Sequence, residues 1–435
     1  MSKSRYLKRV SELLNTSTSK SISALLLSNL TISVIGFLTS ILVLRKLDKE
    51  PIGLLYPLLS ILMLVEQIGD LGLSFSLIKI ASSSKAQKER SQQLAKTVFK
   101  VKVLLALLIS SIGFLISPYL CHLIFNDSAP LYWVRVTLLI SFFSILSGFF
   151  QAYLQIEQRF LKLSLAKVIP TLVKFSLLIF FWNSGTLTFG QVFIAFTAVP
   201  IGTCLLSAFF SGTSFLKTES SFKTDFPEVF HFTKWVLLST IAVSFLGQMD
   251  LFMLRSMKGA EEVARYVGGS RLASILLVMT SAALTVLLPK VSSYKTRREL
   301  RLYFHRTLLL IPPLAFLVVV ASLAAPWFVP FLLGDKYVTS VSVFIIFCFQ
   351  FAVDLFCAPL SLILYNLNKV SLFAWMNISQ FFILCLSNYL LLPSLGAEGA
   401  AISGLIIRCF GLLLVLWVCK QEKIIELPAN HGLAI

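Results

Sequence analysis

The chain has 435 residues, of which 57% are hydrophobic and only 13% charged, and its mean hydropathy is +0.86. This composition excludes an ordinary soluble globular protein and indicates a polytopic membrane protein. The formal net charge of +18 would suggest nucleic-acid binding in a soluble chain, but the Lys and Arg residues are confined to the gaps between apolar runs. We therefore expect the bilayer as a partner, and no nucleic acid.

Apolar runs of about 20 residues, long enough to cross a bilayer as helices, recur twelve times along the chain. They lie near residues 22–44, 52–78, 103–125, 131–154, 163–182, 188–210, 235–256, 266–288, 307–332, 340–364, 371–392 and 396–419. The connecting segments on the side of the N-terminus hold about 27 basic residues, and those on the opposite side about eight. Because cytoplasmic segments carry the excess of Lys and Arg, both termini are predicted to be cytoplasmic.

A weak internal repeat appears when the chain is aligned with itself at a displacement of about 210 residues. It pairs Tyr56 with Tyr266 and Ser82 with Ser292, and each copy ends in a basic segment. The prediction is an all-α membrane protein with twelve transmembrane helices in two parallel six-helix lobes around a central cleft. The expected parts are a cytoplasmic tail (1–21), an N-lobe (22–210), a cytoplasmic inter-lobe loop (211–234), a C-lobe (235–419) and a cytoplasmic tail (420–435).

The second apolar run, from Pro51 to Ile80, contains two carboxylates, Glu66 and Asp70, one helical turn apart. A carboxylate in the middle of a membrane span costs about 2.5 to 3.5 kcal/mol on insertion scales. Both side chains should therefore face protein or water rather than lipid.

Ionisable residues of several spans fall at similar depth. Counting at about 1.5 Å per residue from each cytoplasmic end places five of them between about 13 and 22 Å into the membrane. These are Glu66, Asp70, Lys174, Asp354 and Arg408. They could offer positive charge to an anionic group and balance it with acids that also carry a coupling ion, or they could form buried pairs that fix helix packing.

Three further charged residues lie elsewhere in the spans. Asp250 is somewhat further from the cytoplasmic end, and Arg135 and Arg271 belong to the outer ends of their spans, where arginine commonly snorkels to the interface. Six amide side chains within the spans could line a polar cavity or, as is commoner, hydrogen-bond between helices. They are Asn29, Gln151, Gln155, Gln248, Asn377 and Asn388. The basic segments from Lys79 to Lys102 and from Lys290 to Arg306 could contact anionic lipid head groups or a negatively charged substrate, but topogenic charge alone explains them. The seven cysteines and four histidines show no metal-ligand spacing, so neither a metal nor another cofactor is predicted.

Three stretches resemble the polysaccharide and O-antigen flippases, a branch of the multidrug, oligosaccharidyl-lipid and polysaccharide exporter superfamily. They are VLRKLDKEPIGLLYPLLSILMLVEQIGDLGLSFSLIK, MDLFMLRSMKGAEEVARYVGGSRLASIL and NYLLLPSLGAEGAAISGLI. The third, which begins at Asn388, is the most specific. The resemblance covers nearly the whole chain.

The resemblance implies a V-shaped transporter, similar in fold to multidrug and toxin extrusion transporters, in the bacterial inner membrane. Its substrate would be a polyprenyl-pyrophosphate-linked oligosaccharide, moved to the periplasmic leaflet by alternating access, with other polysaccharide assembly proteins as partners. Lys174 and Arg408, with Arg271 and Arg135, would bind the pyrophosphate. Glu66, Asp70, Asp250 and Asp354 would be counter-charges or couple transport to H⁺ or Na⁺. The sequence departs from this expectation in carrying as many mid-span acids as bases.

Two alternatives stay open. A multidrug and toxin extrusion cation antiporter of the same fold would use Asp70, Glu66 or Asp354 to bind an ion or a cationic drug. An integral-membrane polysaccharide polymerase or ligase would share the hydropathy, but such enzymes usually need a long periplasmic loop for chemistry. The outer segments here are all short, and we therefore predict a transporter rather than an enzyme.

Overall fold

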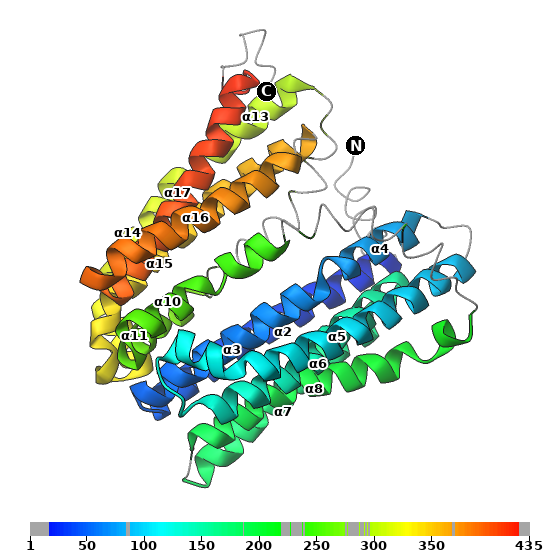
Figure 1. Cartoon of the computed structure of the whole chain (residues 1–435). Coiled ribbons are helices and arrows are strands. Elements are labelled where there is room, and N and C mark those ends of the chain that lie inside the picture. The colour runs from blue at the N-terminus through cyan, green and yellow to red at the C-terminus, as the bar shows by residue number, and fades with distance from the viewer. Residues whose placement is uncertain are drawn as a thin grey trace, which may run out of the picture. The chain divides into compact units, whose positions relative to one another are not determined.

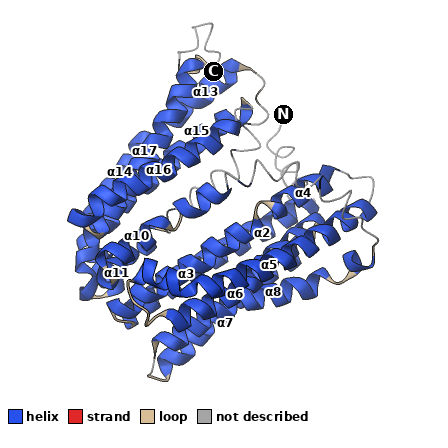
Figure 2. Ribbon diagram, viewed as in Figure 1, coloured by secondary structure: helices blue, strands red, loops and turns tan. Residues whose placement is uncertain are grey.

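A computed structural model describes residues 17–83, 88–185, 187–218, 240–274, 296–367 and 370–425, together with residues 227, 237, 276, 287, 291 and 294. Figure 2 shows helices joined by short connections, with no strand among these residues. The all-α fold class predicted from the sequence is confirmed.

Ten helical segments of the described chain are long and apolar enough to cross a membrane. They correspond to ten of the twelve expected spans. The other two, 235–256 and 266–288, extend beyond the described residues, which here include α10 (Met249–Lys258) and α11 (Ala260–Ala273). Most of both expected tails and most of the inter-lobe loop after residue 218 also lie outside the described residues.

The helices group into two compact units. Unit 1 comprises Met1–Thr39 and Leu58–Ser244, and unit 2 comprises Ser40–Pro57 and Phe245–Ile435. Residues 40–57, which the sequence places within the N-lobe, thus group with the C-terminal part of the chain.

The helices that contribute to unit 1 are α2 (Ser17–Lys46), α3 (Lys49–Asp70), α4 (Leu73–Ser83), α5 (Lys88–Phe125), α6 (Leu131–Ile156), α7 (Phe160–Asn183) and α8 (Phe189–Ser211), followed by the 3₁₀ turn η1 (Ser214–Lys217). Helix α6 packs against α4, α5 and α8, and α7 packs against α8 (Figure 1). Buried aromatic side chains, among them Phe149, Tyr153 and Phe215, form a core beside α4 and α5. This packing holds α6 at the centre of unit 1.

Unit 2 contains α10 and α11 together with α13 (Arg297–Leu308), α14 (Ile311–Leu333), the 3₁₀ turn η2 (Asp335–Ser340), α15 (Val341–Asn366), α16 (Val370–Leu395) and α17 (Ala397–Gln421). Helix α17 packs against both α15 and α16 (Figure 1). Its first turns consist largely of small buried residues from Ala397 to Gly404, which let neighbouring backbones approach closely. One result is that Gln350 of α15 donates a hydrogen bond from Nε2 to the carbonyl of Ala401.

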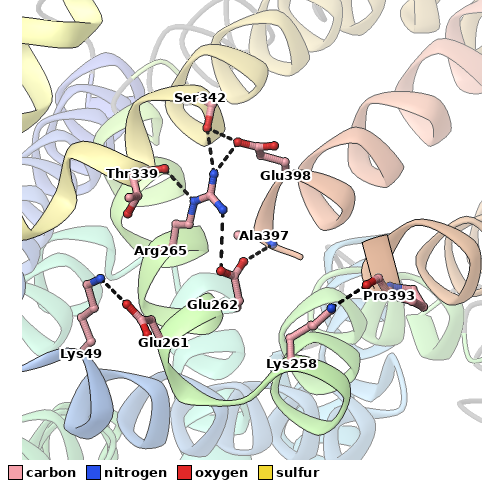
Figure 3. A network of polar contacts seen from close by, with 10 residues as sticks. All are labelled: Lys49, Lys258, Glu261, Glu262, Arg265, Thr339, Ser342, Pro393, Ala397 and Glu398. Atoms are coloured by element: carbon pink, nitrogen blue, oxygen red, sulfur yellow. Dashed lines mark hydrogen bonds and ion pairs between the residues drawn. The ribbon is translucent and has the colours of Figure 1, made fainter. Parts of the chain in front are cut away.

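A network of polar contacts joins α11, η2 and the first turn of α17 in unit 2 (Figure 3). At its centre, Arg265 of α11 donates to the Thr339 carbonyl at 2.7 Å and pairs with Glu398 of α17. The neighbouring Glu262 accepts a hydrogen bond of 2.6 Å from the backbone N–H of Ala397, so a carboxylate stabilises the N-terminus of α17. These contacts fix α11, η2 and α17 relative to one another.

The segment 40–57 is attached to the same part of unit 2. Lys49 pairs with Glu261 at 2.6 Å, and Lys336 donates to the Leu47 carbonyl at 2.5 Å. A Cβ atom on Gly53 would lie only 2.4 Å from the Cα of Ala260, so the two backbones touch there. Residues 40–57 are therefore held by close packing as well as by charge.

Candidate functional site

The second membrane span is broken beside its acidic residues. Helix α3 ends at Asp70, and Leu71 (φ 50°) and Gly72 (φ 75°) adopt left-handed conformations before α4 begins at Leu73. The expectation of one uninterrupted span over 52–78 is wrong at this point. A left-handed conformation costs a non-glycine residue about 1 to 2 kcal/mol, so the surroundings must stabilise the break.

Lys102 of α5 supplies that stabilisation. Its ammonium pairs with Asp70 on one side of the break, and it donates to Ser74 Oγ on the other side at 2.8 Å. Ser74 in turn donates to Asp70 Oδ1 at 2.5 Å. Gly148 of α6 leaves room for this contact, because a Cβ there would lie 3.1 Å from the Lys102 ammonium.

The sequence interpretation treats Lys102 as topogenic charge at the end of a basic segment, whereas the structure also gives it a partner inside the protein. The side chain is 0% exposed. Helix α5 already begins at Lys88, so Lys102 lies about 21 Å along the helix rather than in a connecting segment. Burial of the ammonium is tolerable because it is paired and hydrogen-bonded.

A polar cavity of about 350 Å³ lies next to the break, within unit 1. Its described lining consists of Glu66, Gln67, Asp70, Ser74, Ile78, Ser144, Ile145, Gly148, Gln151, Ala152, Gln155, Leu163, Lys167 and Thr240. These residues come from α3, α4, α6 and α7, with Thr240 following in the chain. The cavity therefore brings together both acids of the second span and two of the six amide residues that the sequence singled out, Gln151 and Gln155.

The charged groups of the cavity differ in how they are satisfied. Asp70 is paired with Lys102, whereas Glu66 accepts a hydrogen bond of 2.7 Å from Ser144 and forms no ion pair with a described residue. The Lys167 ammonium likewise forms no ion pair or hydrogen bond within the described part of the chain. Glu66 and Lys167 attract each other electrostatically without forming a direct ion pair, so a carboxylate oxygen and the ammonium remain available to a ligand.

The other predicted residues of the C-terminal spans lie in unit 2. Arg408 pairs with Asp354 at 2.6 Å, and both side chains are about three-quarters buried. Asp250 accepts hydrogen bonds from Asn388 Nδ2 at 2.8 Å and from the Tyr266 hydroxyl at 2.9 Å. The structure thus brings Arg408 and Asp354 together and gives Asp250 neutral hydrogen-bond donors.

The remaining predicted cations lie against aromatic rings. The Lys174 ammonium is 4.8 Å from the ring centre of Phe196. The Arg135 guanidinium is 4.9 Å from the ring of Phe114, and that of Arg271 is 4.9 Å from the ring of Tyr56. None of these three cations lines the cavity of unit 1.

Sequence reasoning missed Lys102 and Lys167. Lys167 precedes Lys174 by seven residues, close to two helical turns, so a helical projection of this span would have placed both on one side. The sequence indicates Lys102 less directly. A carboxylate such as Asp70 in the middle of an apolar span needs a cation from another span, but the sequence does not say which one.

Three comparisons relate the chain to known proteins. The family model described as polysaccharide biosynthesis protein matches residues 18–295, which is more than half of the chain. A search of curated proteins finds no match. Solved structures match over nearly the full length at low sequence identity.

Among those structures is the lipid II flippase MurJ in an inward closed conformation, with a TM-score of 0.74 and 13% identity, covering 92% of this chain and 89% of that one. An inward-facing multidrug resistance MATE family transporter of the MOP superfamily has a TM-score of 0.69 and 16% identity, covering 91% and 96%. A MOP superfamily transporter from Pyrococcus furiosus, described by a binding pocket of reverse polarity, has a TM-score of 0.62 and 16% identity, covering 96% and 98%. These likenesses establish the fold of MOP superfamily transporters.

Proposed function

The chain belongs to the polysaccharide biosynthesis protein family, and on this premise we propose that it translocates a polyprenyl-pyrophosphate-linked oligosaccharide across the bacterial inner membrane. The movement runs from the cytoplasmic to the periplasmic leaflet by alternating access, with both termini cytoplasmic. The oligosaccharide is an O-antigen unit or a similar surface polysaccharide repeat. Other polysaccharide assembly proteins are the proposed partners, and no covalent chemistry is involved.

The observation that carries the proposal is the polar cavity at the broken span. A lipid-linked oligosaccharide has a head group that is far too polar for the hydrocarbon core, so a protein that moves it must supply polar groups at membrane depth. The cavity of unit 1 does so with Glu66, Lys167 and three glutamines. Discontinuous helices at membrane depth are typical of substrate and ion sites in transporters.

We assign the pyrophosphate to cations outside this cavity, chiefly Lys174 and Arg408, with Arg271 and Arg135 as further contacts. The largely buried pair of Arg408 and Asp354 suits this role, because the carboxylate keeps the guanidinium charge balanced when no anion is bound. The Lys174 ammonium lies 4.8 Å from the ring centre of Phe196, and a pyrophosphate would add an anionic partner to this cation.

For coupling to H⁺ or Na⁺ the best-placed group is Asp250. Its two hydrogen-bond donors are neutral, and the other amide atom of its partner, Asn388 Oδ1, is buried without a hydrogen-bond partner in the described chain. A proton on Asp250, or a sodium ion between its carboxylate and Asn388 Oδ1, would satisfy both groups. Glu66, Asp70 and Asp354 remain proposed counter-charges or coupling groups.

The test is glycan export in cells that lack the native transporter. Lys174→Gln and Arg408→Gln should each abolish surface glycan while the variant protein stays in the membrane at wild-type amount. Gln421→Leu at the end of α17 is the matched control and should export normally. Loss of the protein itself would show that these cations are structural, and normal export by both variants would refute their assignment.

The rival is a multidrug cation antiporter, which the shared fold with MATE family transporters favours. Drug susceptibility and glycan export measured in the same strains separate the two. Drug resistance that depends on Asp70, together with unchanged surface glycan on deletion, would replace the flippase proposal.

A further inference from the structure

We propose that the cavity of unit 1 is a subsite for one uncharged sugar ring, bound through its hydroxyl groups, and not the site of the substrate's phosphates. The inference rests on the proposed function, because the sugar would be a residue of the lipid-linked oligosaccharide. It assigns different chemical parts of one substrate to different parts of the chain.

The charge of the cavity argues against an anionic or a cationic ligand. Glu66 and Asp70 contribute two negative charges, and the adjacent Lys102 together with Lys167 contributes two positive charges. Asp70 and Lys102 already neutralise each other, which leaves one carboxylate and one ammonium. A pyrophosphate placed here would approach Glu66 as well as Lys167, and a cation would meet the opposite conflict.

The hydrogen-bonding groups instead match a polyol. Glu66 can only accept, Lys167 can only donate, and the carboxamides of Gln67 and Gln155 can do both. Neither of these carboxamides bonds to another residue in the described chain. Each sugar hydroxyl is at once a donor and an acceptor, so a ring with several hydroxyls can satisfy this mixed set.

The size and the apolar part of the wall set the extent of the ligand. A volume of about 350 Å³ is at the small end of ligand pockets, which run from about 300 to 1,000 Å³. It suits a single ring rather than a whole oligosaccharide. Ile145 and Leu163 offer aliphatic surface for the C–H face of a ring, and the described lining contains no aromatic residue that would favour a flat cationic drug.

The experiment measures binding to the purified full-length chain in nanodiscs by saturation-transfer NMR. The probes are methyl glycosides of neutral hexoses, deoxyhexoses and N-acetylhexosamines, with inorganic pyrophosphate and tetraethylammonium as charged competitors. At least one glycoside should bind, and neither competitor should displace it. Gln155→Leu and Lys167→Met should each weaken its binding about tenfold, the effect of losing about 1.4 kcal/mol.

Two controls keep a folding defect from imitating loss of the site. Gln421→Leu makes the same change far from the cavity in sequence and in the other unit, and should bind as wild type does. Gln155→Asn keeps the amide and should retain most of the affinity. All variants must give the same thermal unfolding midpoint within error before their binding is compared.

Failure of the sugar site and failure of the proposed function are distinguishable. If no glycoside binds, or if pyrophosphate binds and Lys167→Met abolishes it, the sugar site is refuted. A parallel assay follows lipid-linked oligosaccharide across proteoliposome membranes. If glycosides bind but the lipid-linked oligosaccharide is not translocated, the flippase proposal is refuted and the sugar site stands. If translocation proceeds and neither Gln155→Leu nor Lys167→Met affects it, the sugar site is refuted and the flippase proposal stands.

Discussion

At the scale of single residues, Lys102 shows how a buried charge can organise a site without binding the substrate. Its ammonium is completely buried, and its contacts hold together the helices around the break between α3 and α4. These contacts are with Asp70 at the end of α3, with Ser74 in α4, and with the Ile145 carbonyl of α6 at 3.4 Å. A charge so well satisfied has no donor to spare for a ligand. Lys167, by contrast, makes no such contacts with described residues and faces the cavity.

Replacing Lys102 should destabilise the protein through the carboxylate that it leaves behind. Lys102→Met strands Asp70, which is only 26% exposed, and breaking such a pair costs about 3 kcal/mol. The expected result is a clearly lower midpoint of thermal unfolding in detergent.

The double variant Asp70→Asn with Lys102→Met is the control. It removes both charges and should recover a large part of the loss, because the uncompensated charge has gone. If the double variant is as unstable as the sum of the two single variants, the pair does not act as a unit.

The limits of sequence reasoning are visible at these same residues. The cost of a carboxylate in a membrane span identified Glu66 and Asp70, because that cost depends only on depth. Nothing in the sequence fixes which cation approaches Asp70, since Lys102 is adjacent to a run of basic residues that topology alone explains. Asp70 and Lys102 are 32 residues apart in the sequence, so their pairing is determined by how α3 and α5 pack against each other.

At the scale of the elements, the spans were predictable and the break was not. A bilayer demands about 20 apolar residues for each span, so the runs reveal the helices directly. The break falls within an apolar stretch, Leu71-Gly72-Leu73, and Gly is common inside membrane helices without interrupting them. What distinguishes Gly72 from other glycines in membrane helices is its left-handed backbone conformation, next to the contacts of Lys102 with Asp70 and Ser74.

Two glycine-to-alanine changes should therefore have opposite effects. Gly72→Ala forces a side chain into a left-handed conformation (φ 75°) and should destabilise the protein by about 1 kcal/mol. Gly36→Ala lies within α2, where a Cβ would meet nothing within 4 Å, and should be neutral or stabilising by up to about 1 kcal/mol. Thermal unfolding of the two variants measures the difference, and a stabilising effect of Gly72→Ala would mean that the span is continuous.

At the scale of the whole molecule, the segment 40–57 is held partly by an exposed ion pair that depends on pH. The hydrogen bond and the positive charge of Lys49 hold the pKa of the Glu261 carboxyl below its usual range. A depressed pKa means that the pair contributes at pH above the ordinary value of about 4.3 and is lost as pH falls through the lower, folded-state value.

The unfolding midpoint of wild type should accordingly exceed that of Glu261→Gln slightly at pH 7, and the difference should shrink as the pH falls and the Glu261 carboxylate takes up a proton. The effect is small because the Glu261 side chain is 71% exposed, and 1 M salt should weaken it at pH 7. The charge swap Lys49→Glu with Glu261→Lys should restore what either single change loses. A difference that stays the same as the pH is lowered would show that Glu261 acts through packing rather than charge.

The number of spans is the property of the whole molecule on which orientation depends, and reporter fusions can count them. With twelve spans, alkaline phosphatase fused after residue 48, 127, 259 or 335 should lie in the periplasm and be active. Fusions after residue 87, 158 or 296 should lie in the cytoplasm, where alkaline phosphatase is inactive and green fluorescent protein fluoresces. The fusions after residues 259 and 296 are decisive, because they bracket expected span 8 and the fusion after 259 follows expected span 7. If both of these fusions report the cytoplasm, neither segment crosses the membrane, and the C-terminal four spans keep the expected orientation. If both report the periplasm, expected span 8 does not cross, and the C-terminal four spans are reversed. In the expected orientation, these four spans place Lys369, Lys420 and Lys423 on the cytoplasmic side and only Lys336 on the outer side. Reversal would therefore place more basic residues outside than inside, against the positive-inside rule.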